Sequence, residues 1–283
     1  MPPRTTPAPT RSSPPSRPGD RTLELDKFIG FHRLIEACDE EGCPACRCLD
    51  ADTHRYLTAF LYEHVTDPVS RSRLRASWGL CNWHAWMLRE TADPAFGSAI
   101  LCEDLLRVVG RRLERAASRA ATRPATLFGR LRARLGRARA PAIARIYRRR
   151  VVCPACSELA HAEERYLQTA LHFVDDPQFE QAYEASNGLC VPHALAALEL
   201  AAGDAAGSRL LARTLPKWAE LRRDLAGFVR KHDHRNREPF TEAEASAYLR
   251  AIEVLHGQAG LFANDLRGQE RSERRGSPSP PSE

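Results

Sequence analysis

The sequence has no apolar run long enough to cross a membrane. Its longest apolar stretch, residues 194–206, is interrupted by Glu199 and Asp204, whereas a membrane-spanning helix needs about 20 apolar residues. Residues 1–20 are rich in Pro, Ser, Thr and Arg and have no apolar run, which argues against a secretory signal or a membrane anchor. We therefore expect a cytoplasmic protein that does not bind membranes, with disordered tails at residues 1–20 and 267–283.

Strand patterns and common catalytic motifs are also missing. No segment alternates apolar and polar residues as half-buried strands do, so we expect an all-α fold. The chain has no glycine-rich phosphate loop, no nucleophile elbow and no HExxH helix. We expect no catalytic residues and a role in binding another macromolecule. The alternative is an oxidoreductase or sensor that uses cysteine redox chemistry or an iron–sulfur centre.

Lysine is scarce, because only Lys27, Lys217 and Lys231 accompany 39 arginines. The segment Arg107 to Arg150 holds fifteen arginines and one acid, Glu114, so its local charge is +14 while the whole chain carries +6. Such a block can bind nucleic acid or an acidic protein through counterion release. The competing interpretation is a solvated linker in a chain whose composition reflects a GC-rich genome.

The cysteines, by contrast, follow a repeated pattern. A CxxC motif is followed by a CxxH motif after a gap of 34 residues, and the same order returns with a gap of 33 residues. The first copy supplies Cys43, Cys46, Cys81 and His84, and the second copy supplies Cys153, Cys156, Cys190 and His193. The residues between the motifs also match, with a register of 110 residues that becomes 109 from the Asp-Pro pair onward. This pattern indicates a duplicated module.

Each copy has the apolar spacing of helices. A long helix begins at the Pro of the CxxC motif, an Asp-Pro pair caps a shorter helix, Gly79 or Gly188 ends it, and the CxxH motif opens a third helix. Further helices are predicted at residues 23–38, 97–118 and 210–229 and after the capping box of Thr241 and Glu244. We expect helical module 1 at residues 21–120, an Arg-rich linker at 121–150 and helical module 2 at 151–266.

Three cysteines and one histidine are a donor set that suits zinc. Two short motifs at chain turns place four donors in a tetrahedron, so we expect each module to bind one zinc ion through its own four residues. Thiol redox chemistry, an iron–sulfur centre and unliganded core cysteines are the alternatives. A single four-thiolate site built from both CxxC motifs is disfavoured, because it would leave the CxxH motifs without a role.

Other candidates have simpler explanations. Cys38, Cys48 and Cys102 have no counterparts in the second copy, so we expect them to be small buried residues outside the site. Tryptophans occur beside only one CxxH motif, at Trp78, Trp83 and Trp86, which favours local core over a cofactor platform. His232, Asp233 and His234 follow a predicted helix, where cationic side chains stabilise the helix C-terminus.

The twin CxxC and CxxH motifs and the closing Lys231-His232-Asp233-His234-Arg235 segment resemble an uncharacterised bacterial family, domain of unknown function 6062. The family has an Asp-Pro turn between helices and a closing Lys-His-Asp-Tyr-Arg stretch, and the match covers about residues 23–257. His234 stands where the family tends to have an aromatic residue, and Tyr248 where it tends to have Trp. The resemblance implies no reaction and no partner.

Overall fold

The computed structural model describes residues 29–121 and 151–262, and within these ranges every regular element is a helix. After a helical segment at residues 29–38, the elements are α2 (Pro44–Tyr62), α3 (Pro68–Ser77), α4 (Asn82–Met87), the 3₁₀ turn η1 (Leu88–Glu90), α5 (Pro94–Ala121), α8 (Pro154–His172), α9 (Pro177–Ala185), α10 (Val191–Ala201), α11 (Ala205–Lys231) and α12 (Glu242–His256). The predicted all-α fold is confirmed for this part of the chain. Both predicted tails and residues 122–150 of the Arg-rich block lie outside it.

The capped helix ends follow the predicted signals, whereas α5 and α11 extend beyond the predicted ranges 97–118 and 210–229 at both ends. Asp67 caps α3 by accepting a hydrogen bond from the Ser70 amide, and Asp176 caps α9 in the same way from two amides. Helix α3 ends at Ser77, and the chain then passes through Gly79 at φ +104°, a left-handed conformation that glycine adopts without strain. The capping box of Thr241 and Glu244 at the start of α12 is confirmed.

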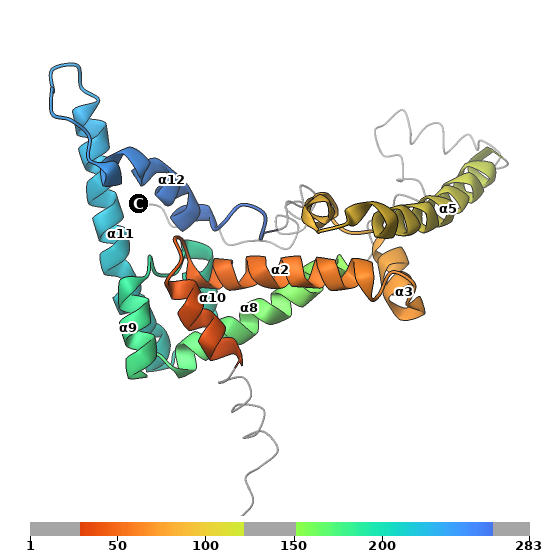
Figure 1. Cartoon of the computed structure of the whole chain (residues 1–283), viewed down its shortest axis with the longest axis horizontal. Helices are drawn as coiled ribbons and strands as arrows, with labels where there is room; N and C mark the ends of the chain where they lie inside the picture. Colours follow the sequence, from red (N-terminus) through yellow and green to blue (C-terminus); the bar gives the residue numbers. More distant parts are fainter. Residues whose placement is uncertain (1–28, 122–150, 263–283) are drawn as a thin grey trace, which may run out of the picture.

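The two longest helices of the repeated segments, α2 and α8, pack side by side in opposite directions (Figure 1). Near their middle the Tyr166 hydroxyl on α8 donates a hydrogen bond to Asp52 on α2 at 3.0 Å, and Arg33 contacts the same carboxylate at 3.2 Å. Because the helices are antiparallel, the N-terminal end of each lies beside the C-terminal part of the other. The start of α2 is thereby brought next to the second half of the chain.

Buried residues form two apolar clusters, one toward each end of this helix pair. The larger joins residues 31–49 to residues from α8, α9, α10 and α11, including Phe31, Leu49, Leu167, Phe179 and Leu210. The smaller joins the C-terminal part of α2 and residues 74–101 to the start of α8, including Leu57, Leu74, Leu101, Cys153 and Ala155. Each cluster therefore contains residues from both halves of the chain.

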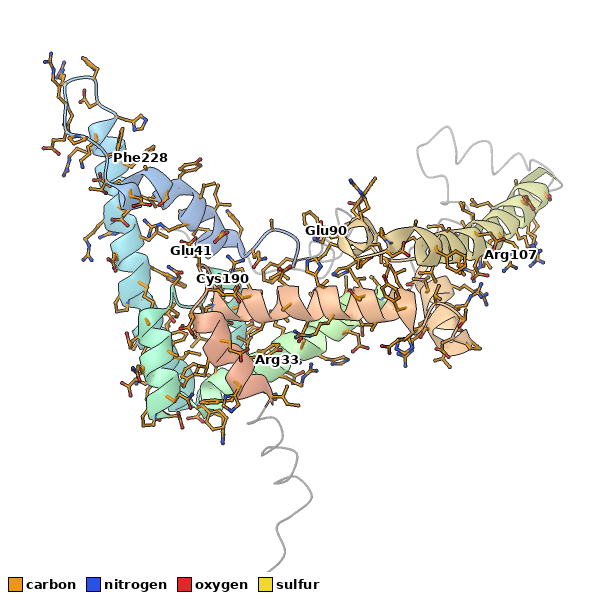
Figure 2. The ribbon with its side chains drawn as sticks, in the orientation of Figure 1. Arg33, Glu41, Glu90, Arg107, Cys190 and Phe228 are labelled. Carbon is orange, nitrogen blue, oxygen red and sulfur yellow. The ribbon has the colours of Figure 1, made fainter. Side chains whose placement is uncertain are left out.

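Helices α11 and α12 form an arm that extends from the α2–α8 pair (Figure 1). Their connection is held by Lys231, whose Nζ donates to Glu244 at 2.6 Å and to the Pro239 carbonyl at 3.0 Å. Phe228 packs there against the rings of His232 and Phe240 (Figure 2). Among the described helices, none is both long and apolar enough to cross a membrane.

Candidate metal centres

The eight residues of the repeated motifs gather into two clusters that could each hold a metal ion. We call Cys43, Cys46, Cys190 and His193 the first cluster, and Cys81, His84, Cys153 and Cys156 the second cluster. The expectation that each copy of the repeat encloses its own four residues is therefore wrong. Each cluster takes its CxxC motif from one half of the chain and its CxxH motif from the other.

The antiparallel packing of α2 and α8 explains this exchange. Each CxxC motif lies at the N-terminus of one long helix. The C-terminal part of the other long helix lies beside it, so the CxxH segment that follows this other helix in the sequence is close to the motif. Cys190 accordingly lies beside the N-terminal end of α2 (Figure 2). A single site built from both CxxC motifs is also excluded, because Cys46 and Cys156 belong to different clusters.

The spacing of the first cluster fits a tetrahedral ion. The His193 Nδ1 atom lies 3.4 Å from the sulfur of Cys43, 3.4 Å from that of Cys46 and 3.2 Å from that of Cys190. The sulfur atoms of Cys46 and Cys190 are 3.8 Å apart. A tetrahedral zinc site with ordinary bond lengths has edges of about 3.8 Å between sulfurs and about 3.5 Å between sulfur and nitrogen. The donors thus need little adjustment to bind zinc.

The second cluster has the same dimensions. The His84 Nδ1 atom lies 3.2 Å from the sulfur of Cys81, 3.7 Å from that of Cys153 and 3.4 Å from that of Cys156. The sulfurs of Cys81 and Cys156 are 3.7 Å apart. All four donor atoms in each cluster lie within 4.8 Å of one another. Both clusters therefore fit a closed site of three thiolates and one imidazole.

Crowding of the thiols perturbs their ionisation. Burial alone would raise the pKa of Cys43, but hydrogen bonds within the cluster, first that with Cys190, hold it well below its usual value. Hydrogen bonds with Cys190 and Cys43 raise the pKa of Cys46. In the second cluster the pKa of Cys153 falls to about 3, chiefly through hydrogen bonding with Cys156.

These opposite shifts have one cause. Close thiols share their protons, because several adjacent thiolates repel one another in a buried site. A divalent cation removes that repulsion and allows all three sulfurs to ionise. The donor sets therefore fit a metal ion better than they fit free thiols.

Side chains from α9 and α11 fix the backbone before Cys190. The Leu189 amide donates to the Tyr183 hydroxyl at 3.0 Å, and the Leu189 carbonyl accepts from the Trp218 indole at 3.0 Å. The Gly42 amide donates to the Asn187 side chain at 2.9 Å, which joins the loop before Cys190 to the loop before Cys43. The two motifs of the first cluster are thus positioned by bonds outside the cluster.

The two histidines differ on the side away from the thiols. The His193 Nε2 atom lies 3.3 Å from the Glu163 carboxylate. Among the described residues, neither buried Nε2 atom makes a hydrogen bond, and the difference is that a carboxylate lies within ion-pair range of His193 alone. In the register of the repeat Glu163 corresponds to Thr53, whose hydroxyl donates to the Leu49 carbonyl instead. Sequence reasoning missed Glu163, although the register of the repeat marks it as a difference between the copies.

The remaining cysteines and the tryptophans match the predictions only in part. Cys38 and Cys48 are buried, as expected, but Cys102 is exposed on α5. The prediction that Cys102 is buried is therefore wrong, because Cys102 lies on an exposed face of α5 together with Leu106, four positions later. Trp83 and Trp86 are 39% and 60% exposed. They do not form the local core that was predicted.

The segment after α11 matches its structural explanation. His232 lies at the C-terminal cap of α11, and its Nδ1 atom is 3.1 Å from the Phe228 carbonyl. Asp233 accepts a hydrogen bond from the Arg235 amide and so shapes the turn. These contacts stabilise the connection to α12 and bring neither residue near the two clusters.

Comparisons with known proteins give a family and no activity. The chain is 26% identical over 226 residues to an "Uncharacterized 23.9 kDa protein in xynA 3'region" from Caldicellulosiruptor sp. (strain Rt8B.4), covering 79% of this chain and 99% of that protein. No solved structure matches. The model of the "Family of unknown function (DUF6062)" matches residues 33–260, which include all eight residues of the two clusters. The chain therefore belongs to this family of unknown function.

Proposed function

We propose that the protein is a helical scaffold cross-linked by two zinc ions, one per cluster, and that it acts by binding another macromolecule. The observation that supports this role is the completeness of both donor sets. Structural zinc sites use four protein ligands, whereas catalytic sites keep a position for water or substrate. Each cluster offers four protein donors at tetrahedral spacing.

The donor chemistry favours zinc over the alternatives. Thiolates with one imidazole are typical of structural zinc, while iron–sulfur clusters are held mainly by four thiolates. A redox role for the CxxC motifs would leave Cys81, His84, Cys190 and His193 without a purpose. Free thiols persist in reducing compartments, which agrees with a cytoplasmic location.

The proposed ions would cross-link the two halves of the chain, because each cluster takes its residues from both halves. The first cluster joins residues 150 positions apart, and the second joins residues 69 positions apart. Closing such long loops costs chain entropy, and metal binding in small helical proteins supplies folding free energy. We therefore expect each ion to hold the two halves of the chain together, so that both contribute to one binding surface.

Elemental analysis of the full chain, purified under reducing conditions, tests the proposal. We expect two zinc ions per chain, and one ion per chain for Cys190→Ser. The matched control is Cys102→Ser, which removes an exposed cysteine outside both clusters and should keep two ions. Metal-free protein with reactive thiols of low pKa would overturn the proposal in favour of redox chemistry.

The partner surface that we favour is the Arg-rich end of α5. Helix α5 extends away from the α2–α8 pair (Figure 1), and its exposed residues include Arg111 and Arg115. Arg107 and Arg112 bond within the chain instead, to Asp104 and to the Arg75 carbonyl. This surface suits an anionic partner such as nucleic acid or an acidic protein.

A salt titration tests this surface. Replacing Arg111 and Arg115 by Gln should weaken binding to a duplex DNA probe and lower the salt dependence of the affinity. An unchanged affinity and an unchanged salt slope would remove these residues from the partner surface.

A further inference from the structure

The two clusters have the same donors but different surroundings. In the first cluster Cys43 is 7% exposed, Cys46 is 1% exposed, and both Cys190 and His193 are fully buried. In the second cluster His84 and Cys153 are buried, but Cys81 and Cys156 are partly exposed. The second cluster is therefore the more exposed of the two, because two of its cysteines are partly exposed.

The C-terminal segment after α12 covers the first cluster. The Gln258 amide donates to the sulfur of Cys46 at 3.5 Å, and the ring of Phe262 packs on His193 with centroids 5.3 Å apart. Leu261 is buried in the larger apolar cluster beside them. An amide that donates to a thiolate stabilises its charge, and an apolar cover limits the access of water.

Glu163 adds a second difference. Its carboxylate lies 3.3 Å from His193 Nε2, on the side of the ring opposite the Nδ1 atom that faces the thiols. A carboxylate that accepts a hydrogen bond from the outer nitrogen of a ligating imidazole fixes its orientation and makes it a stronger donor, and its loss typically weakens metal binding about 10- to 100-fold. In the described part of the chain no carboxylate lies within ion-pair range of His84 Nε2, although neither Nε2 atom makes a hydrogen bond.

We propose that the two centres are unequal, so that the first cluster keeps its ion while the second cluster exchanges its ion with ligands in solution. Release of zinc from thiolates requires a proton or a competing ligand to reach the sulfur, and exposure governs that access. The inference rests on the proposed function, since it assumes that both clusters bind zinc. It assigns permanent cross-linking to the first cluster and sensitivity to free zinc or chelators to the second. Glu163 is a positioning residue for the first cluster.

Chelator competition on the zinc-loaded full chain tests this difference. A chromogenic chelator in excess should remove the two ions in two phases of equal amplitude. Cys156→Ser should lack the fast phase, and Cys190→Ser should lack the slow phase. A single phase, or the reverse assignment of the phases, would overturn the inference, whereas a chain that never binds two ions would instead refute the proposed function.

Alkylation of the unaltered protein gives the same test without variants. After the fast phase, N-ethylmaleimide followed by mass spectrometry should find Cys81, Cys153 and Cys156 modified, and Cys43, Cys46 and Cys190 protected. Equal modification of both groups would contradict the inference. This measurement remains decisive if a cysteine variant fails to fold.

The role of Glu163 has its own matched variants. Glu163→Ala should accelerate the slow phase about 10- to 100-fold and leave the fast phase unchanged. Glu163→Gln keeps an oxygen that accepts a hydrogen bond, so it should restore part of the slow release. Glu164→Ala, one position later on an exposed face of α8, is the control and should change neither phase. Equal rates for Glu163→Ala and Glu164→Ala would remove Glu163 from this role.

Discussion

The Nδ1 atom of His193 lies 3.4 Å from the sulfur of Cys43, although 150 residues separate them in the sequence. His84 and Cys153 form the corresponding contact at 3.7 Å in the second cluster. In both contacts the histidine of a CxxH motif meets a cysteine of the CxxC motif from the other half of the chain. Loss of one ligand should therefore affect residues in both halves.

Substitution of Cys190 distinguishes the crossed arrangement from a local one. In Cys190→Ser we expect Cys43 and Cys46 to become reactive toward an alkylating reagent, because they share a cluster with Cys190. Cys153 and Cys156 should stay protected. Mass spectrometry of the alkylated peptides measures this pattern, and Cys81→Ser should give the opposite one. Reactive Cys153 and Cys156 in Cys190→Ser would show that each half binds its own ion.

Tyr183→Phe should destabilise the protein by about 1–3 kcal/mol, the usual cost of leaving a buried polar group without its partner. The Tyr183 hydroxyl is buried, accepts from the Leu189 amide and lies 2.6 Å from the Thr214 hydroxyl. Urea denaturation of the two zinc-loaded proteins measures the change. Because Leu189 precedes Cys190, the variant should also release the ion of the first cluster faster. Unchanged stability would mean that water replaces the lost hydroxyl.

Two helical glycines should respond in opposite ways to alanine. A Cβ atom at Gly227 on α11 would lie 2.3 Å from the Glu244 carboxylate, so Gly227→Ala should separate α11 from α12. Gly110 on α5 has open space around it, and Gly110→Ala should stabilise the protein by about 0.5–1 kcal/mol. Thermal unfolding of both variants measures the two changes in stability. An equal gain at both positions would show that Glu244 moves aside at no cost.

Asp104 should make the stability depend on pH. Its carboxylate is nearly buried and contacts Arg75 at 2.6 Å and Arg71 at 3.0 Å. The hydrogen bond from Arg75 is the main cause that lowers the pKa of Asp104 below its usual value. The stabilisation from these contacts is therefore complete above the unfolded pKa of about 3.9 and is lost as the pH falls through the folded pKa.

The test is Asp104→Asn, compared with the original chain between pH 7 and pH 3. We expect the variant to lose about 1–3 kcal/mol at pH 7, and the difference to shrink below about pH 4. Glu103→Gln, a neighbouring carboxylate that is 69% exposed, is the control and should show little difference at any pH. A deficit of Asp104→Asn that persists at pH 3 would assign the effect to packing instead of charge.

Local signals predicted the helices well but not the assignment of the ligands. The Asp caps at Asp67 and Asp176 and the capping box at Thr241 depend on residues a few positions apart, so the sequence contains all that decides them. The two CxxH motifs are equivalent in sequence, so either could complete either CxxC motif. Helix lengths hold a clue, because α2 has 19 residues and α3 only 10. At 1.5 Å per residue the return helix is about 14 Å too short to span α2.

The sequence by itself determined the helical fold, the helix caps and the eight cysteine and histidine residues that form the two clusters, because each depends on residue type and short spacing. The tertiary structure decided which four donors meet, since the burial of the apolar faces of α2 and α8 against each other, in opposite directions, places each CxxC motif beside the CxxH motif of the other half. It also decided that Glu163 faces His193 while Cys81 and Cys156 remain partly exposed. Contacts between residues so far apart arise only when the whole chain packs, because no local spacing specifies them.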